Sequence, residues 1–148
     1  MGKKNLTDES MVKIYNNTFG SASFFGTDGR RYKFPKYKSS RMVALSVVQD
    51  LYNDYPNSIE SGIFVLSDKD VYDYIGVDKE VVDKILTDAE IDELLEKDVK
   101  DLEKELKELP DVIQENVAKR AKSKDLDSTK ARKTIKNVTG FDLDESIE

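Results

Sequence analysis

The chain has 148 residues, of which 38% are hydrophobic and 36% charged, and its formal net charge at pH 7 is −6. This length allows one domain of ordinary size with a helical appendage, and is too short for two full domains. The chain contains no cysteine and no histidine, which excludes disulfides and thiolate metal sites and removes the commonest general base of enzymes. We therefore expect a protein that is not an enzyme and that uses no cofactor or metal.

We expect no targeting signal in the N-terminal residues. No hydrophobic segment follows the first lysines, and no apolar run approaches the roughly 20 residues of a membrane-spanning helix. We expect a chain that is not secreted and has no membrane partner. Residues 1–9 are polar and lack periodicity, so they are predicted to form a flexible arm.

Residues 10–76 have the pattern of a small α+β domain with four to five short strands and two short helices. In its first part, apolar and aromatic residues alternate between glycine- and asparagine-rich turns, which is typical of strands joined by tight turns. The Asp28-Gly29 pair is the strongest hairpin signal in the chain. The first three strands are predicted near 11–16, 21–26 and 30–34.

Residues 42–45 are ambiguous between strand and helix, because four consecutive apolar residues reveal no period. Ser46, followed by Gln49 three residues later, resembles a capping box at a helix N-terminus. This pattern favours a fourth strand over 42–45 and a short helix over 47–54.

The apolar run 62–66 is predicted to be a buried central strand, since it carries no polar residue that could face solvent. A second helix is expected to begin with Ser67 as its N-cap and Asp70 in its first turn. Gly76 is placed to end that helix, because glycine readily adopts the left-handed conformation at a helix C-terminus.

Residues 77–148 are predicted to form an all-helical, strongly charged region. Thr87 and Glu90 form a capping box that begins a helix at Asp88, and apolar residues then recur every three or four positions until Pro110. One helix, or two nearly collinear ones, should cover 88–109. The candidate helix-packing seam consists of Ile91, Leu94, Leu95, Leu102, Leu106 and Leu109.

This seam leaves two alternatives open, because its narrow spacing fits either a coiled coil between copies or packing on the chain's own surface. Burial of the seam is expected in both cases, since an exposed apolar stripe is unfavourable in a monomer. A further helix should follow Pro110, and a last one should run from an Asp127-Ser128 cap to Gly140, with Phe141 folding back on it.

Two segments concentrate positive charge. Residues 30–41 hold six basic and no acidic side chains, with aromatic residues between them, and 119–136 hold eight basic against two acidic side chains. Such segments can bind nucleic acid or another anionic partner, although charged helices are more often simply solvated faces. The candidate binding residues are Arg30, Arg31, Lys33, Lys36, Lys38 and Arg41 in the first segment, and Lys119, Arg120, Arg132 and Lys133 in the second.

Two further runs stand near the ends of the chain: Val12-Lys13-Ile14-Tyr15-Asn16-Asn17-Thr18 with Arg30-Arg31-Tyr32, and the closing residues 129–143. Together these runs resemble small uncharacterised proteins of tailed bacteriophages that are encoded among the virion genes. The resemblance implies a location in the virion or the host cytoplasm and protein partners, either virion proteins or other copies of the chain. It brings no active site.

The leading hypothesis is a non-enzymatic structural or assembly protein of a bacteriophage virion. In this hypothesis the β-rich part docks on a larger protein. The charged helices either mediate self-association into a homo-oligomer or contact a cargo. The alternative is a nucleic-acid-binding or regulatory adaptor that uses the basic segments 30–41 and 119–136. The two differ in salt dependence, because binding to phosphates weakens steeply as salt increases.

Overall fold

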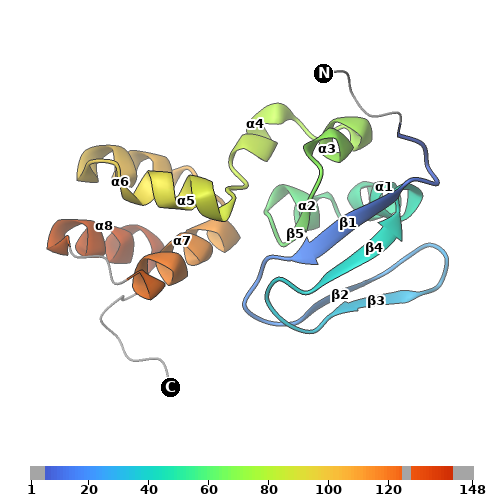
Figure 1. Ribbon diagram of the computed structural model, residues 1–148, viewed down its shortest axis with the longest axis horizontal. Helices are drawn as coiled ribbons and strands as arrows, with labels where there is room; N and C mark the ends of the chain where they lie inside the picture. The colour runs from blue at the N-terminus through green and yellow to red at the C-terminus, as the bar shows by residue number, and fades with distance from the viewer. Residues whose placement is uncertain (1–5, 125–127, 142–148) are drawn as a thin grey trace. The chain divides into compact units, whose positions relative to one another are not determined.

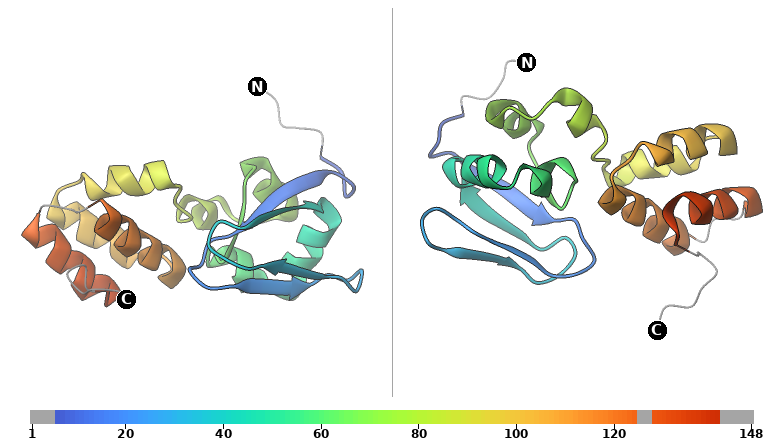
Figure 2. Two further views of the ribbon diagram at one scale, coloured as in Figure 1. Left: turned by 60° about the horizontal axis from the view of Figure 1, so that its bottom comes forward. Right: turned by 180° about the vertical axis from the view of Figure 1, so that it is seen from behind.

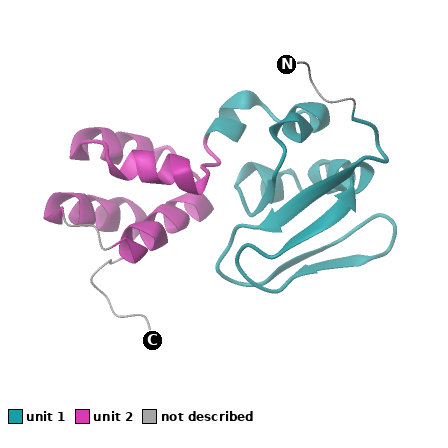
Figure 3. Ribbon diagram, in the orientation of Figure 1, with its two compact units in different colours: residues 1–83 teal, residues 84–148 magenta. Residues whose placement is uncertain are grey.

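The computed structural model describes residues 6–124 and 128–141, which belong to two compact units, 1–83 and 84–148 (Figure 3). The fold is α+β, as predicted: within the described residues the strands lie in unit 1, and unit 2 consists of helices. The helical region was expected to begin at residue 77, but unit 1 extends to Asp83 and includes a short helix before the boundary.

Unit 1 is built on a three-stranded antiparallel sheet in the order β4-β1-β5 (Figure 1). Its strands are β1 (Met11–Asn16), β4 (Ser40–Ala44) and β5 (Phe64–Leu66). Alternation along β1 buries Val12, Ile14 and Asn16 on one face. The prediction of β5 as the central strand is wrong, because β1 occupies the centre and β5 pairs only with it.

Strand β5 is nevertheless buried along its whole length, which explains its continuous apolar sequence. The helices α2 (Pro56–Glu60) and α3 (Lys69–Ile75) both contact it. At one position the Leu66 N–H donates to the Tyr72 hydroxyl over 3.0 Å, so a side chain replaces the missing strand. Burial raises the pKa of Tyr72 to about 12.

The remaining strands, β2 (Ala22–Phe25) and β3 (Arg31–Phe34), form a separate two-stranded hairpin (Figure 2). Its inward side chains Phe24 and Phe34 pack on Phe64 of β5, with ring centroids 5.4 and 5.1 Å from the Phe64 ring. Gly29 adopts φ 82° in the connecting turn, as the predicted Asp-Gly hairpin requires. The hairpin is thereby fixed to one face of the sheet through its aromatic side.

The helices of unit 1 begin where the sequence did not place them. Helix α1 (Leu45–Asp54) starts directly after β4, and its N-cap Ala44 makes no side-chain hydrogen bond, so the capping box expected at Ser46 is absent. Asp68 caps α3 by accepting from the backbone N–H of Asp70, in place of Ser67. Gly76 ends α3 in the left-handed conformation, as predicted, and α4 (Lys79–Asp83) follows.

The flexible arm predicted for residues 1–9 is partly hydrogen-bonded to the rest of unit 1. Residues 1–5 lie outside the described residues, whereas Asp8 is bonded at two points: its carboxylate accepts from the Tyr74 hydroxyl over 2.8 Å, and its carbonyl accepts from the Ser46 N–H. Thr7 and Ser10 are hydrogen-bonded to each other. The described end of this segment therefore belongs to the fold of unit 1.

Unit 2 contains α5 (Asp88–Leu95), α6 (Val99–Lys107), α7 (Asp111–Ser123) and α8 (Thr129–Thr139). The capping box at Thr87 and Glu90 is confirmed. The region 88–109 forms two helices, and the chain turns between them at Asp98, whose extended backbone and side-chain cap begin α6 afresh. Ser128 caps α8 as predicted, while Asp127 lies outside the described residues.

The predicted seam forms the core of unit 2. Ile91, Leu94 and Leu95 of α5 are buried, as are Leu102 and Leu106 of α6, and Leu109 is partly buried beside them. The other core side chains come from α7 and α8: Val117, Ala118, Ala121, Ala131 and Ile135. Of the two alternatives left open by the sequence, the structure thus shows packing within the chain, and this seam offers no free surface for a coiled coil.

In the described part of the chain, no helix combines the length and apolar character needed to cross a membrane. Phe141, which was expected to fold back on α8, is 37% exposed.

Candidate functional site

The hairpin β2-β3 has two chemically different faces. Alternation turns Phe24, Tyr32 and Phe34 inward, where they are buried in the core of unit 1. The outward side chains belong to two directly opposed pairs. These pairs are Phe25 with Arg31 and Ser23 with Lys33. We call the surface formed by these four residues the outer hairpin face; it contains an aromatic ring, two cations and a hydroxyl.

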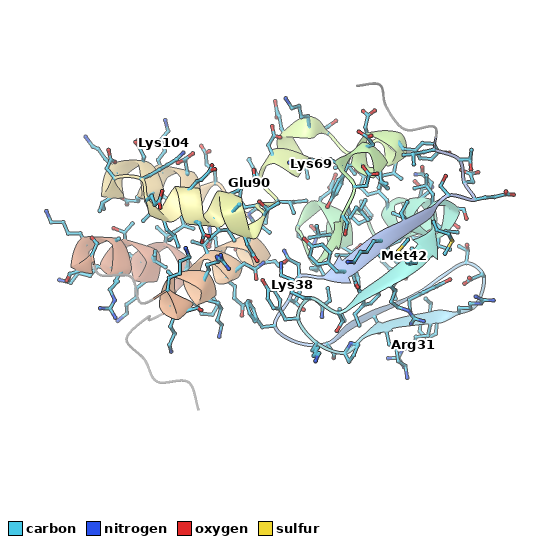
Figure 4. All side chains as sticks on the ribbon, viewed as in Figure 1. Arg31, Lys38, Met42, Lys69, Glu90 and Lys104 are labelled. Carbon is cyan, nitrogen blue, oxygen red and sulfur yellow. The ribbon has the colours of Figure 1, made fainter. Side chains whose placement is uncertain are left out.

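Phe25 and Arg31 form a cation–π pair on this face. The Arg31 guanidinium carbon lies 5.7 Å from the centroid of the Phe25 ring, and its Nη2 lies 3.4 Å from the Ser23 hydroxyl. Phe25 is 70% exposed, so its ring is largely open to solvent. Figure 4 shows Arg31 pointing away from the hairpin. The pair therefore offers both a ring surface and a charge to solvent.

Next to this pair the outer hairpin face is hollowed. The hollow has a volume of about 310 Å³. No carboxylate is among its lining residues, which bring together two cations and two hydroxyls with apolar surface. The lining residues are Ser21, Ala22, Ser23, Arg31, Lys33, Phe34 and Pro35. Cations and hydroxyls without a competing acid are suited to binding an anionic oxygen group such as a phosphate.

Asn16 holds the loops on both sides of the hairpin. It is fully buried, and its Nδ2 donates to the carbonyls of Gly20, Phe34 and Lys36 over 2.7, 3.4 and 3.1 Å. Its Oδ1 accepts from the backbone N–H and the hydroxyl of Thr18. Sequence reasoning missed this residue, although its place in the buried register of β1 was a signal, since a polar side chain there must find internal partners.

The hairpin turn contains Asp28, the one acidic residue between positions 19 and 41. Its carboxylate accepts from the Tyr32 hydroxyl over 2.7 Å and from the backbone N–H of Arg30. The hydrogen bond from Tyr32 is the main reason why the pKa of Asp28 is lowered, and the same bond raises the pKa of Tyr32. This acid is therefore committed to the turn and lies outside the lining of the hollow.

The other cations of segment 30–41 have different surroundings. Lys38 places its Nζ 5.0 Å from the Tyr15 ring centroid and 5.1 Å from that of Tyr37. Arg41 lies over the Tyr32 ring at 5.5 Å. Lys36 and Arg30 are exposed, and Arg30 lies 4.0 Å from the Asp28 carboxylate. Of the six predicted binding residues, the structure brings two together at the hollow, Arg31 and Lys33.

Two cations of the second basic segment, Arg120 and Lys124, are paired with carboxylates within unit 2. Arg120 donates to both carboxylate oxygens of Asp92 over 2.6 and 2.8 Å and lies 3.7 Å from Asp88. Lys124 also reaches Asp92, over 3.1 Å. These partners, Arg120 foremost, hold the pKa of Asp92 far below its usual range. Lys119 and Arg132 are half-buried, and Lys133 is exposed.

Comparison with known proteins gives no further assignment: no protein-family model, no curated protein and no solved structure matches this chain. The resemblance to phage proteins stays a prediction. The residues described by the structure contain no cluster of three or more acidic side chains placed to hold a metal ion. The outer hairpin face with its hollow is the site that the geometry favours.

Proposed function

We propose that this protein is a non-enzymatic adaptor that binds nucleic acid on the outer hairpin face. The observation that carries the proposal is the hollow on this face, which is lined by Arg31, Lys33 and two serine residues and by no carboxylate. Arginine and lysine neutralise backbone phosphates, and hydroxyls add hydrogen bonds to phosphate oxygens.

The net charge of the chain makes this local arrangement informative. An overall charge of −6 repels a polyanion at long range, but charges more than about 10 Å away are largely screened at moderate ionic strength. Contact with phosphate therefore depends on the charges at the face itself. Two acids lie at the hairpin turn: Asp28 accepts from the Tyr32 hydroxyl and Asp50 from the Thr27 hydroxyl, and neither lines the hollow.

The proposal is tested with the double variant Arg31→Ala/Lys33→Ala. Binding of a fluorescent oligonucleotide of about 16 nucleotides is measured by anisotropy between about 50 and 200 mM salt. We expect at least a tenfold loss of affinity at low salt, and a log-log salt slope shallower by about one to two units, because two phosphate contacts are removed.

The matched control is Lys130→Ala/Lys133→Ala, which removes two exposed lysines of α8 from the other basic segment and changes the net charge equally. This control should retain at least half of the wild-type affinity. Equal losses in both double variants would show that net charge alone governs binding. An oligonucleotide that fails to bind the wild-type protein at low salt would overturn the proposal.

A second candidate function is assembly in a virion, with unit 1 docked on a larger protein. One observation favours it: Met11 and Met42 are 58% and 57% exposed on the outer face of the three-stranded sheet, where Met42 pairs with Lys13. Exposed methionines are common at protein-binding surfaces. The helical seam is internal to unit 2, so this face is the surface proposed for self-association in its place.

Light scattering at low and high salt tests this candidate directly. An oligomer that survives high salt and dissociates in a Met11→Gln/Met42→Gln variant would support assembly through the sheet. A monomer under both conditions, with unchanged mass in the variant, would count against self-assembly and leave the nucleic-acid proposal as the one to pursue.

A further inference from the structure

We infer that the outer hairpin face selects single-stranded nucleic acid, with an unpaired base stacked on Phe25 and the neighbouring phosphates held by Arg31 and Lys33. This inference rests on the proposed function, because it names the class of nucleic acid and the contact that would recognise it. It adds a role for the exposed aromatic ring, which phosphate binding alone leaves unexplained.

The surroundings of Phe25 support stacking. The three other aromatic side chains of the hairpin strands, Phe24, Tyr32 and Phe34, are buried and stacked on one another, with ring centroids 5.1 to 6.0 Å apart. Phe25 alone points outward, 70% exposed, with the Arg31 guanidinium on its ring. A ring with this exposure retains open area for a base, and the guanidinium can itself stack on a base or contact its phosphate.

The register of the hairpin sets the distance between the ring and the second cation. Phe25 pairs with Arg31, and the next outward pair along the strands is Ser23 with Lys33. Two residues of a strand span roughly 7 Å, which is comparable with the reach from a base to a backbone phosphate. A base on Phe25 would therefore bring the adjoining phosphate toward the hollow lined by Lys33 and Ser21.

A duplex fits this face less well. Its bases are paired and stacked on one another, so an aromatic ring on a strand surface can reach only the backbone. No recognition helix belongs to the outer hairpin face, whose elements are the two strands β2 and β3. An acidic peptide would satisfy the two cations but would make no use of the ring face, so it is treated as an outcome of the test.

The chain contains no tryptophan, so Phe25→Trp introduces a single tryptophan at the point of contact, whose fluorescence is excited selectively over that of the tyrosines. We expect single-stranded oligonucleotides to quench this fluorescence strongly, because a stacked base lies directly on the indole. Duplex of equal length and inorganic polyphosphate should quench it weakly. Tyr55→Trp is the control, since Tyr55 is similarly exposed, at 64%, and lies outside the hairpin. Equal quenching at both positions would overturn the inference.

Affinity measurements on Phe25→Ala complete the test. Loss of one stacked base should weaken single-strand binding by about tenfold to a hundredfold while leaving the salt slope unchanged. Phe25→Leu keeps an apolar side chain and should show the same loss. Circular dichroism melts of both variants should match the wild type, since the ring is exposed. The same affinity measurement with DNA and RNA strands of one sequence shows whether the ribose 2′-hydroxyl contributes to binding.

Failure of this inference is distinguishable from failure of the proposed function. If Arg31→Ala/Lys33→Ala weakens binding and the Phe25 variants do not, the phosphate contacts stand and the stacking contact is wrong. Poly-glutamate is the acidic-peptide probe. If it binds as tightly as the single strand and competes with the single strand for the protein, the face recognises acidic peptides and the inference is overturned. Preference for duplex would overturn it as well.

Discussion

The two basic segments look alike in sequence and differ in how the structure uses them. On the hairpin, Arg31 and Lys33 face outward beside a hollow that no carboxylate lines. In unit 2, Arg120 of α7 and its C-cap residue Lys124 both contact Asp92 of α5, so that their charge is neutralised within the fold. The density of cations is therefore a poor guide to binding. The carboxylates that face those cations decide whether the charge is available to a partner.

Helical spacing explains the difference. Asp88 and Asp92 are four residues apart on α5, and Arg120 of α7 is four residues before the C-cap Lys124, whose backbone is still helical, so each pair lies on one face. Packing of the two helices brings these faces together. The cross-strand neighbours of a hairpin are instead fixed by register, which pairs Arg31 with Phe25 and Lys33 with Ser23.

The strongest test of the internal role of unit 2 is Leu102→Asp, which places a charge at a fully buried core position of α6. Leucine-to-alanine changes in cores already lower the free energy of unfolding by about 3 to 5 kcal/mol, and a buried unpaired charge lowers it further. We expect unit 2 to unfold, with a loss of helical signal in circular dichroism. Lys104→Asp on the same helix, at an exposed position, should leave the signal intact.

The alternative outcome is informative. A Leu102→Asp protein that keeps its helices and shows a lower solution mass than the wild type would mean that the seam joins copies of the chain. That result would contradict the packing of α5 and α6 against α7 and α8, and would restore the coiled-coil alternative.

The second-largest effect is expected for Asn16, which holds the loops on both sides of the hairpin. Asn16→Ala removes the side chain that bonds three carbonyls from within the core, so buried acceptors lose their partner. We expect the free energy of unfolding of unit 1 to decrease by about 2 to 3 kcal/mol, measured by urea denaturation. Oligonucleotide affinity should decrease too, because the hairpin is less well positioned. Asn53→Ala, at an exposed site, should change stability by less than about 0.5 kcal/mol.

Much of the fold was predictable from the sequence, because local signals specify local elements. Asp28-Gly29 placed the hairpin, Thr87 and Glu90 placed the start of α5, and the period of the seam identified the core of unit 2. These signals act within a few residues. Capping signals were less uniform, since the box at Thr87 and Glu90 is present whereas the one expected at Ser46 is absent.

What the sequence left open depends on contacts between distant residues. Helix α2 was not expected, because it is only five residues long and starts with a proline at its first turn rather than with a side-chain cap. The edge position of β5 depends on α2 and α3 covering it. The candidate site likewise depends on register: six cations in 30–41 were equivalent in sequence, and the pairing of β2 with β3 selected Arg31 and Lys33.

The smallest expected effect sharpens the comparison of the two segments directly. Arg120→Ala removes the main partner of Asp92 and should lower the midpoint of thermal unfolding by about 2 to 4 °C, while leaving oligonucleotide affinity unchanged. Arg31→Ala should instead leave the midpoint of thermal unfolding unchanged and weaken oligonucleotide binding. Lys104→Ala, which removes an exposed lysine, controls for the loss of one positive charge. Weaker oligonucleotide binding by Arg120→Ala would show that its charge serves an external partner.

The pH dependence of the stability difference between the wild type and Arg120→Ala identifies the cause of that difference. The pKa of Asp92 in the folded protein is below its ordinary value of 3.8, because Arg120 and Lys124 stabilise the carboxylate. A lowered pKa contributes stability that is fully present above the unfolded-state value and is lost as the pH falls below it. The stability gap between wild type and Arg120→Ala should therefore be constant from about pH 6 to 8 and should narrow below about pH 4. A gap that persists at low pH would assign the effect of Arg120 to the packing of its aliphatic stem, because that contribution does not depend on the charge of Asp92.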